Sequence, residues 1–198
     1  GRSPVTRPAT TRVDQRHVLT IGDALALADA VGRAGPTVDG EPLGARYRFA
    51  VILAATAGLR PSEMWGLPPD AVIDIDGTPH LRVAEPLVRS TKAFTGNGSD
   101  TERRDRLKQR GPGEARYVPL PTEVARLWDE HVARYASDEF AFTSRLGRAV
   151  RWGNDGVAVW RPALQAAFEG RHRIDLSDLR KVAVTWWLRS GIDHHTAA

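Results

Sequence analysis

The apolar positions along the chain follow helical spacing more often than strand spacing. The longest apolar run, at 45–57, is rich in Ala and predicts a buried helix. Apolar residues on one helical face predict further helices at 20–31, 121–135, 157–170 (interrupted or kinked at Pro162) and 176–189. We therefore expect a mainly helical protein.

Strand patterns are fewer and shorter. AVIDID (71–76) and HLRVAEPLV (80–88) alternate around a glycine turn and predict a hairpin, and ARYVPL (115–120) predicts a third short strand. EFAFTS (139–144) fits either a short strand or an extended segment. The expected loops are 32–44 and 145–154, and 89–114 is a basic, glycine-containing excursion with few core-forming residues.

A tight junction separates the apolar helix at 45–57 from a short helix predicted at 61–67. Gly58 can end the first helix in the left-handed conformation, and Pro61 suits the first turn of the second, with Glu63 just inside it. Arg60 is thus held between two helices, a rigid place for a cation that binds a phosphate. A purely structural alternative is that Arg60 pairs with Glu63 or caps backbone carbonyls.

Composition narrows the possible chemistry. The 198 residues carry a net charge of +4 and no Cys, which excludes disulfides, thiolate metal ligands and a cysteine nucleophile. No apolar run approaches the roughly 20 residues of a membrane span. His172, His194 and His195 lack the spacing of a helical metal site, so we expect no metal and no cofactor.

Hydrolase and nucleotide-binding motifs are also missing, since the chain has no G-x-S-x-G, no phosphate loop and no G-x-G-x-x-G turn after a strand. The remaining constellation consists of cations at the edges of predicted elements: Arg60, Lys108, Arg180 and Lys181. Several fixed cations around one cluster of oxygens suit phosphoryl transfer.

Three segments together resemble the tyrosine recombinases, the phage-integrase family. TAGLRPSEMWGL is similar to the first arginine motif of that family, T-G-L-R-x-S-E-x-x-x-L, with Ala57 inserted between Thr56 and Gly58. SDLRKVAVTWWLRSGID (177–193) resembles the second motif, H-D-L-R-H, and LKQRGPGEARYVPLP resembles the hairpin that bears the catalytic lysine. The three occur in the family's order over residues 20–198.

The resemblance implies a role for each matching position. Arg60 and Arg180 would clamp the scissile phosphate, and Glu63 would orient or neutralise Arg60. Lys108 would protonate the departing sugar hydroxyl, with Lys92 as the competing candidate. Ser177 and Lys181 stand where the family has two histidines, which is a departure from its pattern. The expected contacts to the DNA backbone come from a basic run together with Lys92: Arg103, Arg104, Arg106, Lys108 and Arg110.

The nucleophile is a second departure from the family, because none of Tyr47, Tyr117 or Tyr135 follows the second motif, and each is expected to be a packing residue. We therefore expect a catalytic domain at 17–198, incomplete at its C-terminus and inactive alone, behind a flexible linker at 1–16. The implied fold is α+β, mainly helical with a small antiparallel sheet of about three strands.

The implied partner is double-stranded DNA, with self-association of the full-length protein into a tetramer on DNA and no membrane. The implied setting is the cytoplasm, at the nucleoid, for a bacterial or phage-encoded protein. Two alternatives remain: a DNA-binding module of the same fold that has lost catalysis, and a metal-independent nuclease. The sequence offers the nuclease no water-activating pair of carboxylates.

Overall fold

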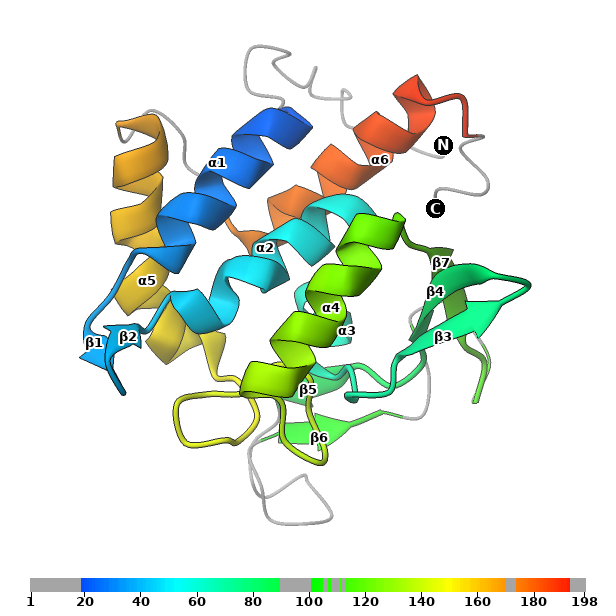
Figure 1. Cartoon of the computed structure of the whole chain (residues 1–198), viewed down its shortest axis with the longest axis horizontal. Helices are drawn as coiled ribbons and strands as arrows, with labels where there is room; N and C mark the ends of the chain where they lie inside the picture. Colours follow the sequence, from blue (N-terminus) through cyan, green and yellow to red (C-terminus); the bar gives the residue numbers. More distant parts are fainter. Residues whose placement is uncertain are drawn as a thin grey trace, which may run out of the picture.

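A computed structural model describes residues 19–89, 101–104, 107, 111, 113–169 and 174–192. Its centre is helix α2 (Ala45–Ala57), which lies between α1 (Ile21–Gly32) and α4 (Thr122–Tyr135), with α6 (Leu179–Arg189) packed on it as well (Figure 1). Helix α5 (Trp152–Phe168) packs against α1 on the far side from the sheet.

Helix α2 is central because it is apolar on nearly every face, and a helix of that kind is stable only when neighbours cover it all round. Its described side chains are buried from Phe49 through Ala55 without interruption. Small Ala residues let the neighbouring helices approach, and larger rings fill the space at either side. Phe49 stacks on Phe142 with ring centroids 6.2 Å apart, and Tyr47 meets Trp65 edge-on at 6.3 Å.

The sheet predicted from the alternating segments is confirmed. Strands β3 (Val72–Ile75), β4 (Thr78–Val83) and β7 (Arg116–Pro119) form one antiparallel sheet in the order β3-β4-β7. Leu81 is the register partner of both Val72 and Val118, so these three apolar side chains lie on the same face of the sheet, toward the core. The helices and this small sheet confirm the expected α+β class.

The segment predicted as one strand over 80–88 is instead divided in two. Strand β4 ends at Val83, and β5 (Leu87–Arg89) begins after Pro86, which has no N–H to donate to a ladder. Strand β5 pairs with β6 (Thr101–Arg103), which lies inside the stretch predicted as an exposed excursion. The prediction missed this pair because its partners are short and separated in sequence.

Several other boundaries differ from the predictions. The predicted loop at 32–44 contains the two-residue strands β1 (Thr37–Val38) and β2 (Glu41–Pro42). Helix α5 begins at Trp152, not at 157, because the Trp152 ring packs against aromatic core residues, and it continues through Pro162. The segment at 139–144 has only an isolated bridge, between Thr143 and Ala149.

The two arginine motifs occupy short elements at the edge of the core. Helix α3 (Pro61–Trp65) follows α2 directly and ends two residues before the predicted limit. The predicted helix at 176–189 starts as a 3-10 turn, η3 (Leu176–Asp178), and continues as α6. Among the described residues, no helix combines the length and apolar character that crossing a bilayer requires.

Candidate active site and nucleic-acid interface

The junction between α2 and α3 fixes Arg60 in the way its sequence predicts. Gly58 ends α2 in the left-handed conformation, with φ +61° and ψ +39°. Arg60 is the N-cap of α3 in extended conformation, and Pro61 occupies the first turn. The backbone N–H of Arg60 donates to Oε2 of Glu63 at 3.0 Å, so the start of the helix is closed by its own acidic residue.

Glu63 is a buried carboxylate, with 3% of its side chain exposed, and two arginines meet it. Arg60 Nη1 donates to Oε1 at 3.0 Å, and Arg116 Nη2 donates to Oε2 at 2.9 Å. The pairing of Arg60 with Glu63 that the structural alternative required is therefore present. It leaves the Arg60 side chain 37% exposed, so the same residue is accessible to a ligand.

Arg180 reaches this junction from the other end of the chain. Its Nη1 donates to the backbone carbonyl oxygen of Gly58 at 2.5 Å, across 122 positions of sequence. Burial lowers the pKa of Arg180, the nearby charge of Arg60 lowers it further, and Glu63 opposes both effects. The structure thus brings together Arg60, Glu63 and Arg180, three positions to which the family resemblance assigned a shared site.

The resulting set of side chains is called the arginine cluster below: Arg60, Glu63, Arg116 and Arg180. It carries three guanidinium cations against a single carboxylate. Arginine stays protonated at any ordinary pH, so the excess charge is permanent. Planar guanidinium groups that are half-buried and close together suit an oxyanion with several oxygens, such as a phosphate.

Arg116 is the member of this cluster that the sequence interpretation missed. It lies on β7, two positions before Val118, and alternate residues of a strand share one face. Val118 is buried, so Arg116 also points inward, and its side chain is only 14% exposed. The sequence did contain a signal for this contact: an arginine at an inward strand position needs an anionic partner, and the first motif supplies one in Glu63.

Ser177 and Lys181 lie on the turns beside Arg180 and are both exposed. The Ser177 hydroxyl is paired with Asp175, and Lys181 Nζ donates to Asp178 Oδ1 at 2.6 Å, which raises the pKa of the lysine. Ser177 and Lys181 therefore each have an acidic partner two or three residues away in sequence.

The basic run predicted to contact DNA is only partly described. Arg103 turns inward: it donates to the carbonyl oxygens of Gly66 and Glu139, each at 2.6 Å, and lies over the Phe140 ring at 4.6 Å. Arg104 is exposed. The other predicted contacts, and both lysine candidates for the general acid, lie outside the described residues: Lys92, Arg106, Lys108 and Arg110.

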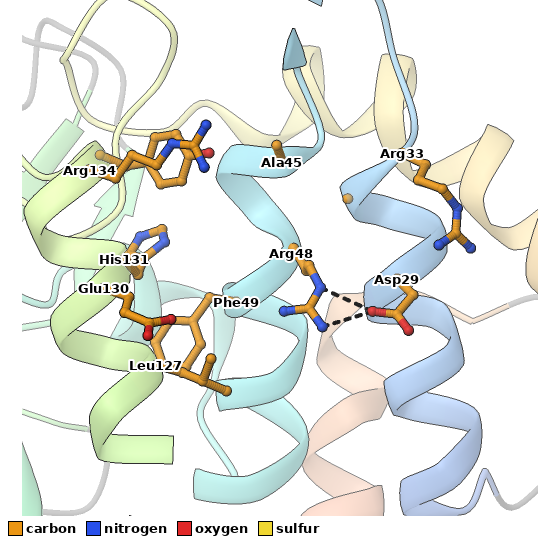
Figure 2. A pocket seen from close by; sticks show the side chains of 11 residues that line it. Asp29, Arg33, Ala45, Arg48, Phe49, Leu127, Glu130, His131 and Arg134 are labelled. Atoms are coloured by element: carbon orange, nitrogen blue, oxygen red, sulfur yellow. Dashed lines mark hydrogen bonds and ion pairs between the residues drawn. The ribbon is translucent and has the colours of Figure 1, made fainter. Parts of the chain in front are cut away.

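Two of the cavities in the described part of the chain bear on the candidate site and its surroundings. One, of about 340 Å³, has Glu63 in its wall together with Arg103 and several acidic side chains, so it lies against the arginine cluster. The other, of about 360 Å³, lies between α1, α2 and α4 and contains none of the motif residues. Figure 2 shows its walls, with Asp29 bonded to Arg48 on one side and His131 on the other.

His131 is the buried titratable group of this second cavity. Its Nε2 lies 3.1 Å from the carbonyl oxygen of Ala141, to which it donates, and its ring packs near Phe49 and Phe142. Burial lowers the pKa of His131 to about 4; the bond to Ala141 opposes the shift, and Arg46 reinforces it. His131 is therefore a neutral core residue at neutral pH. Among the described residues, no three His, Cys, Asp or Glu side chains gather where a metal ion could be held.

Comparison with known proteins identifies the architecture. No protein-family model and no curated protein matches the sequence. Among solved structures, the chain is similar to the Tn1549 transposon integrase in complex with transposon right end DNA, with a TM-score of 0.64 and 16% identity over 99% of this chain and 58% of that one.

Two other similar structures are recombinases. XerH bound to palindromic difH substrate matches with a TM-score of 0.59 and 14% identity over 91% of this chain and 44% of that one. XerA recombinase matches with a TM-score of 0.58 and 16% identity over 99% and 58%. The chain thus spans less than two thirds of each of these proteins, and it has the tyrosine-recombinase fold that its arginine motifs predicted.

Proposed function

We propose that this chain is the catalytic domain of a site-specific DNA recombinase or integrase, which cleaves and rejoins DNA strands through a covalent phosphotyrosine. The observation that carries the proposal is the meeting of Arg60 and Arg180. Arg180 is bonded to the Gly58 carbonyl, two residues before Arg60, and the charge of Arg60 is close enough to lower the pKa of Arg180. Two guanidinium groups held there can both donate to one phosphate.

In the proposed reaction, a tyrosine oxygen forms a bond to phosphorus while the bond from phosphorus to the sugar oxygen breaks. Arg60 and Arg180 stabilise the charge that develops on the non-bridging oxygens. Lys108 gives its proton to the departing sugar oxygen, with Lys92 as the competing donor. Attack of a sugar hydroxyl on the phosphotyrosine reverses these steps and rejoins a strand. The arrangement needs no metal, because arginines and a lysine supply the positive charge.

We further propose that residues 1–198 alone form no covalent adduct with DNA. Tyr47 is fully buried, and the Tyr135 hydroxyl donates to Glu41 at 3.0 Å. Tyr117 is 49% exposed, which contradicts its predicted packing role. As the neighbour of Arg116 in β7 it faces the opposite side of the sheet from the arginine cluster.

Double-stranded DNA is the partner we propose, and the Tn1549 integrase and XerH structures, both complexes with DNA, support it. Self-association into a tetramer on DNA remains a proposal for the full-length protein, as does action at the nucleoid. The exposed Arg104 is the described member of the basic run that is best placed for a backbone contact.

Binding of a fluorescent duplex tests the proposal. Arg60→Gln and Arg180→Gln should each weaken binding by about tenfold, because each removes charge-assisted hydrogen bonds to phosphate. Arg126→Gln is the matched control, since it removes one exposed arginine charge from α4, where Glu123 and Glu130 already pair with it. Equal losses of affinity in all three variants would show that only the overall positive charge matters for binding. That result would overturn the proposed clamp.

The second candidate is a DNA-binding module that has lost catalysis. The pairing of Ser177 with Asp175 and of Lys181 with Asp178 favours it, because acidic partners occupy the groups at the family's histidine positions. Hydrogen peroxide, a small nucleophile that needs no tyrosine, discriminates between the two. Strand breaks that appear with the wild-type chain and disappear in Arg60→Gln support catalysis, whereas bound but intact DNA supports the second candidate.

A further inference from the structure

Glu63 holds the arginine cluster together, and both of its oxygens are occupied. Oε1 accepts from Arg60 Nη1, and Oε2 accepts from the Arg60 backbone N–H and from Arg116 Nη2. A carboxylate facing one arginine alone can take two parallel bonds from its guanidinium. Here Oε2 is taken by Arg116 and by the Arg60 backbone N–H, so the Arg60 guanidinium is bonded to Glu63 through a single nitrogen.

Arg116 is placed to act on Glu63 and not on a ligand. Its side chain is 14% exposed, against 37% for Arg60, so a bound phosphate has access to Arg60 first. The pKa of Arg116 is lowered by burial and by the charges of Arg180 and Arg60, and Glu63 opposes these effects. A buried cation in this setting is retained only with a close anionic partner, which Glu63 provides.

The charges of the cluster add to this geometry. One carboxylate paired with Arg60 alone would make a neutral pair next to Arg180. With Arg116 present, the same carboxylate is shared between two cations, and the cluster keeps an excess of two positive charges. Because Glu63 is shared, its attraction for Arg60 is weaker than in a simple pair. The other edge of the Arg60 guanidinium can then donate hydrogen bonds to a ligand.

We infer that Arg116 is a positioning residue: by occupying Oε2 of Glu63, it holds Arg60 in the orientation that presents its outer guanidinium edge to a phosphate. The inference rests on the proposed function, because it concerns the same phosphate. It adds a residue from β7 to a site otherwise built from the two arginine motifs.

A cycle of variants at Arg116 and Glu63 tests the inference, with the affinity for a fluorescent duplex as the readout and circular dichroism as the check of folding. Arg116→Met should weaken binding by about fivefold to tenfold, close to the loss caused by Arg60→Gln. Because Arg116 acts through Glu63, the same change in a Glu63→Gln background should alter affinity by less than about twofold. Arg116→Lys should recover part of the loss, since lysine keeps the charge but offers no planar fork.

Each other outcome has a distinct meaning. An unchanged affinity with a lowered melting temperature would make Arg116 purely structural, and equal losses in both backgrounds would make it a direct phosphate contact; either result overturns the inference. If Arg116→Met does not fold, Arg116→Lys in the two backgrounds decides by the same comparison. A wild-type chain that does not bind the duplex, or an Arg60→Gln variant that binds as well as wild type, would instead refute the proposed function.

Discussion

Arg180 donates from Nη1 to the carbonyl oxygen of Gly58 at 2.5 Å, and this bond joins the second arginine motif to the end of α2. Gly58 also lies next to the Trp187 ring of α6. Two residues of α6, Arg180 and Trp187, therefore contact the C-terminal end of α2. Since Arg60 follows Gly58 by two residues, any shift of α6 changes the distance between the two arginines. The relative position of the motifs is therefore set by packing as well as by charge.

Gly58→Ala should destabilise the protein by about 2–4 kcal/mol, because two costs add at this residue. A side chain would have to adopt φ +61°, and its Cβ would come within 2.8 Å of Cη2 of Trp187. Urea denaturation followed by tryptophan fluorescence measures the change in the free energy of unfolding.

Gly77→Ala is the matched control for that substitution. Gly77 also has a positive φ, +79°, but nothing lies within 4 Å of the position its Cβ would take. Gly77→Ala should lower the free energy of unfolding by only about 1 kcal/mol, because the strained backbone conformation is the only penalty. Equal losses at both glycines would show that contact with Trp187 contributes nothing.

Arg103→Ala should lower stability by about 2–4 kcal/mol, because it leaves two backbone carbonyls without their donor and removes the cation over Phe140. Thermal melting monitored by circular dichroism measures the effect. The adjacent Arg104→Ala, at an exposed position, should change stability by less than about 0.5 kcal/mol. The reverse order of the two effects would contradict the inward role of Arg103.

His131 should make stability depend on pH in a defined window. Its pKa is about 4 in the folded chain and near 6.5 when unfolded, so between these values the unfolded state binds more protons. Stability should therefore fall by about 3 kcal/mol as the pH drops from 6.5 to 4, and the contribution should level off below that.

The control for this prediction is His131→Gln, which keeps an N–H for the Ala141 carbonyl but cannot titrate. The free energy of unfolding of the variant should change less across the same window than that of the wild type. Parallel pH profiles for the two proteins would assign the acid sensitivity to carboxylates elsewhere.

Local signals explain most of what the sequence predicted correctly. Gly58 and Pro61 define the α2–α3 junction within four residues, and the alternation around Gly77 defines the β3–β4 hairpin. These features depend on backbone preferences that each residue carries with it. The approach of Arg180 to Arg60 was expected from family resemblance, since no local pattern relates residues so far apart.

Long-range pairing explains what the sequence did not reveal. Arg103 is part of a basic run, and charged runs usually face solvent, yet its partners Gly66 and Glu139 come from segments far away in the sequence. The partner of Arg116 is likewise 53 positions away. Such contacts depend on which strands pair, and the short β5–β6 pair with Pro86 beside it gave no recognisable alternation.

The salt dependence of duplex binding by the Arg60→Gln/Arg180→Gln double variant tests most directly whether the two arginines bind one phosphate. If they do, the slope of log affinity against log salt concentration should become shallower than that of wild type by about 0.9, the contribution of a single phosphate. A change of about 1.8 would mean that each arginine holds its own phosphate, and an unchanged slope would mean that neither binds one. Either of these two results would contradict the account.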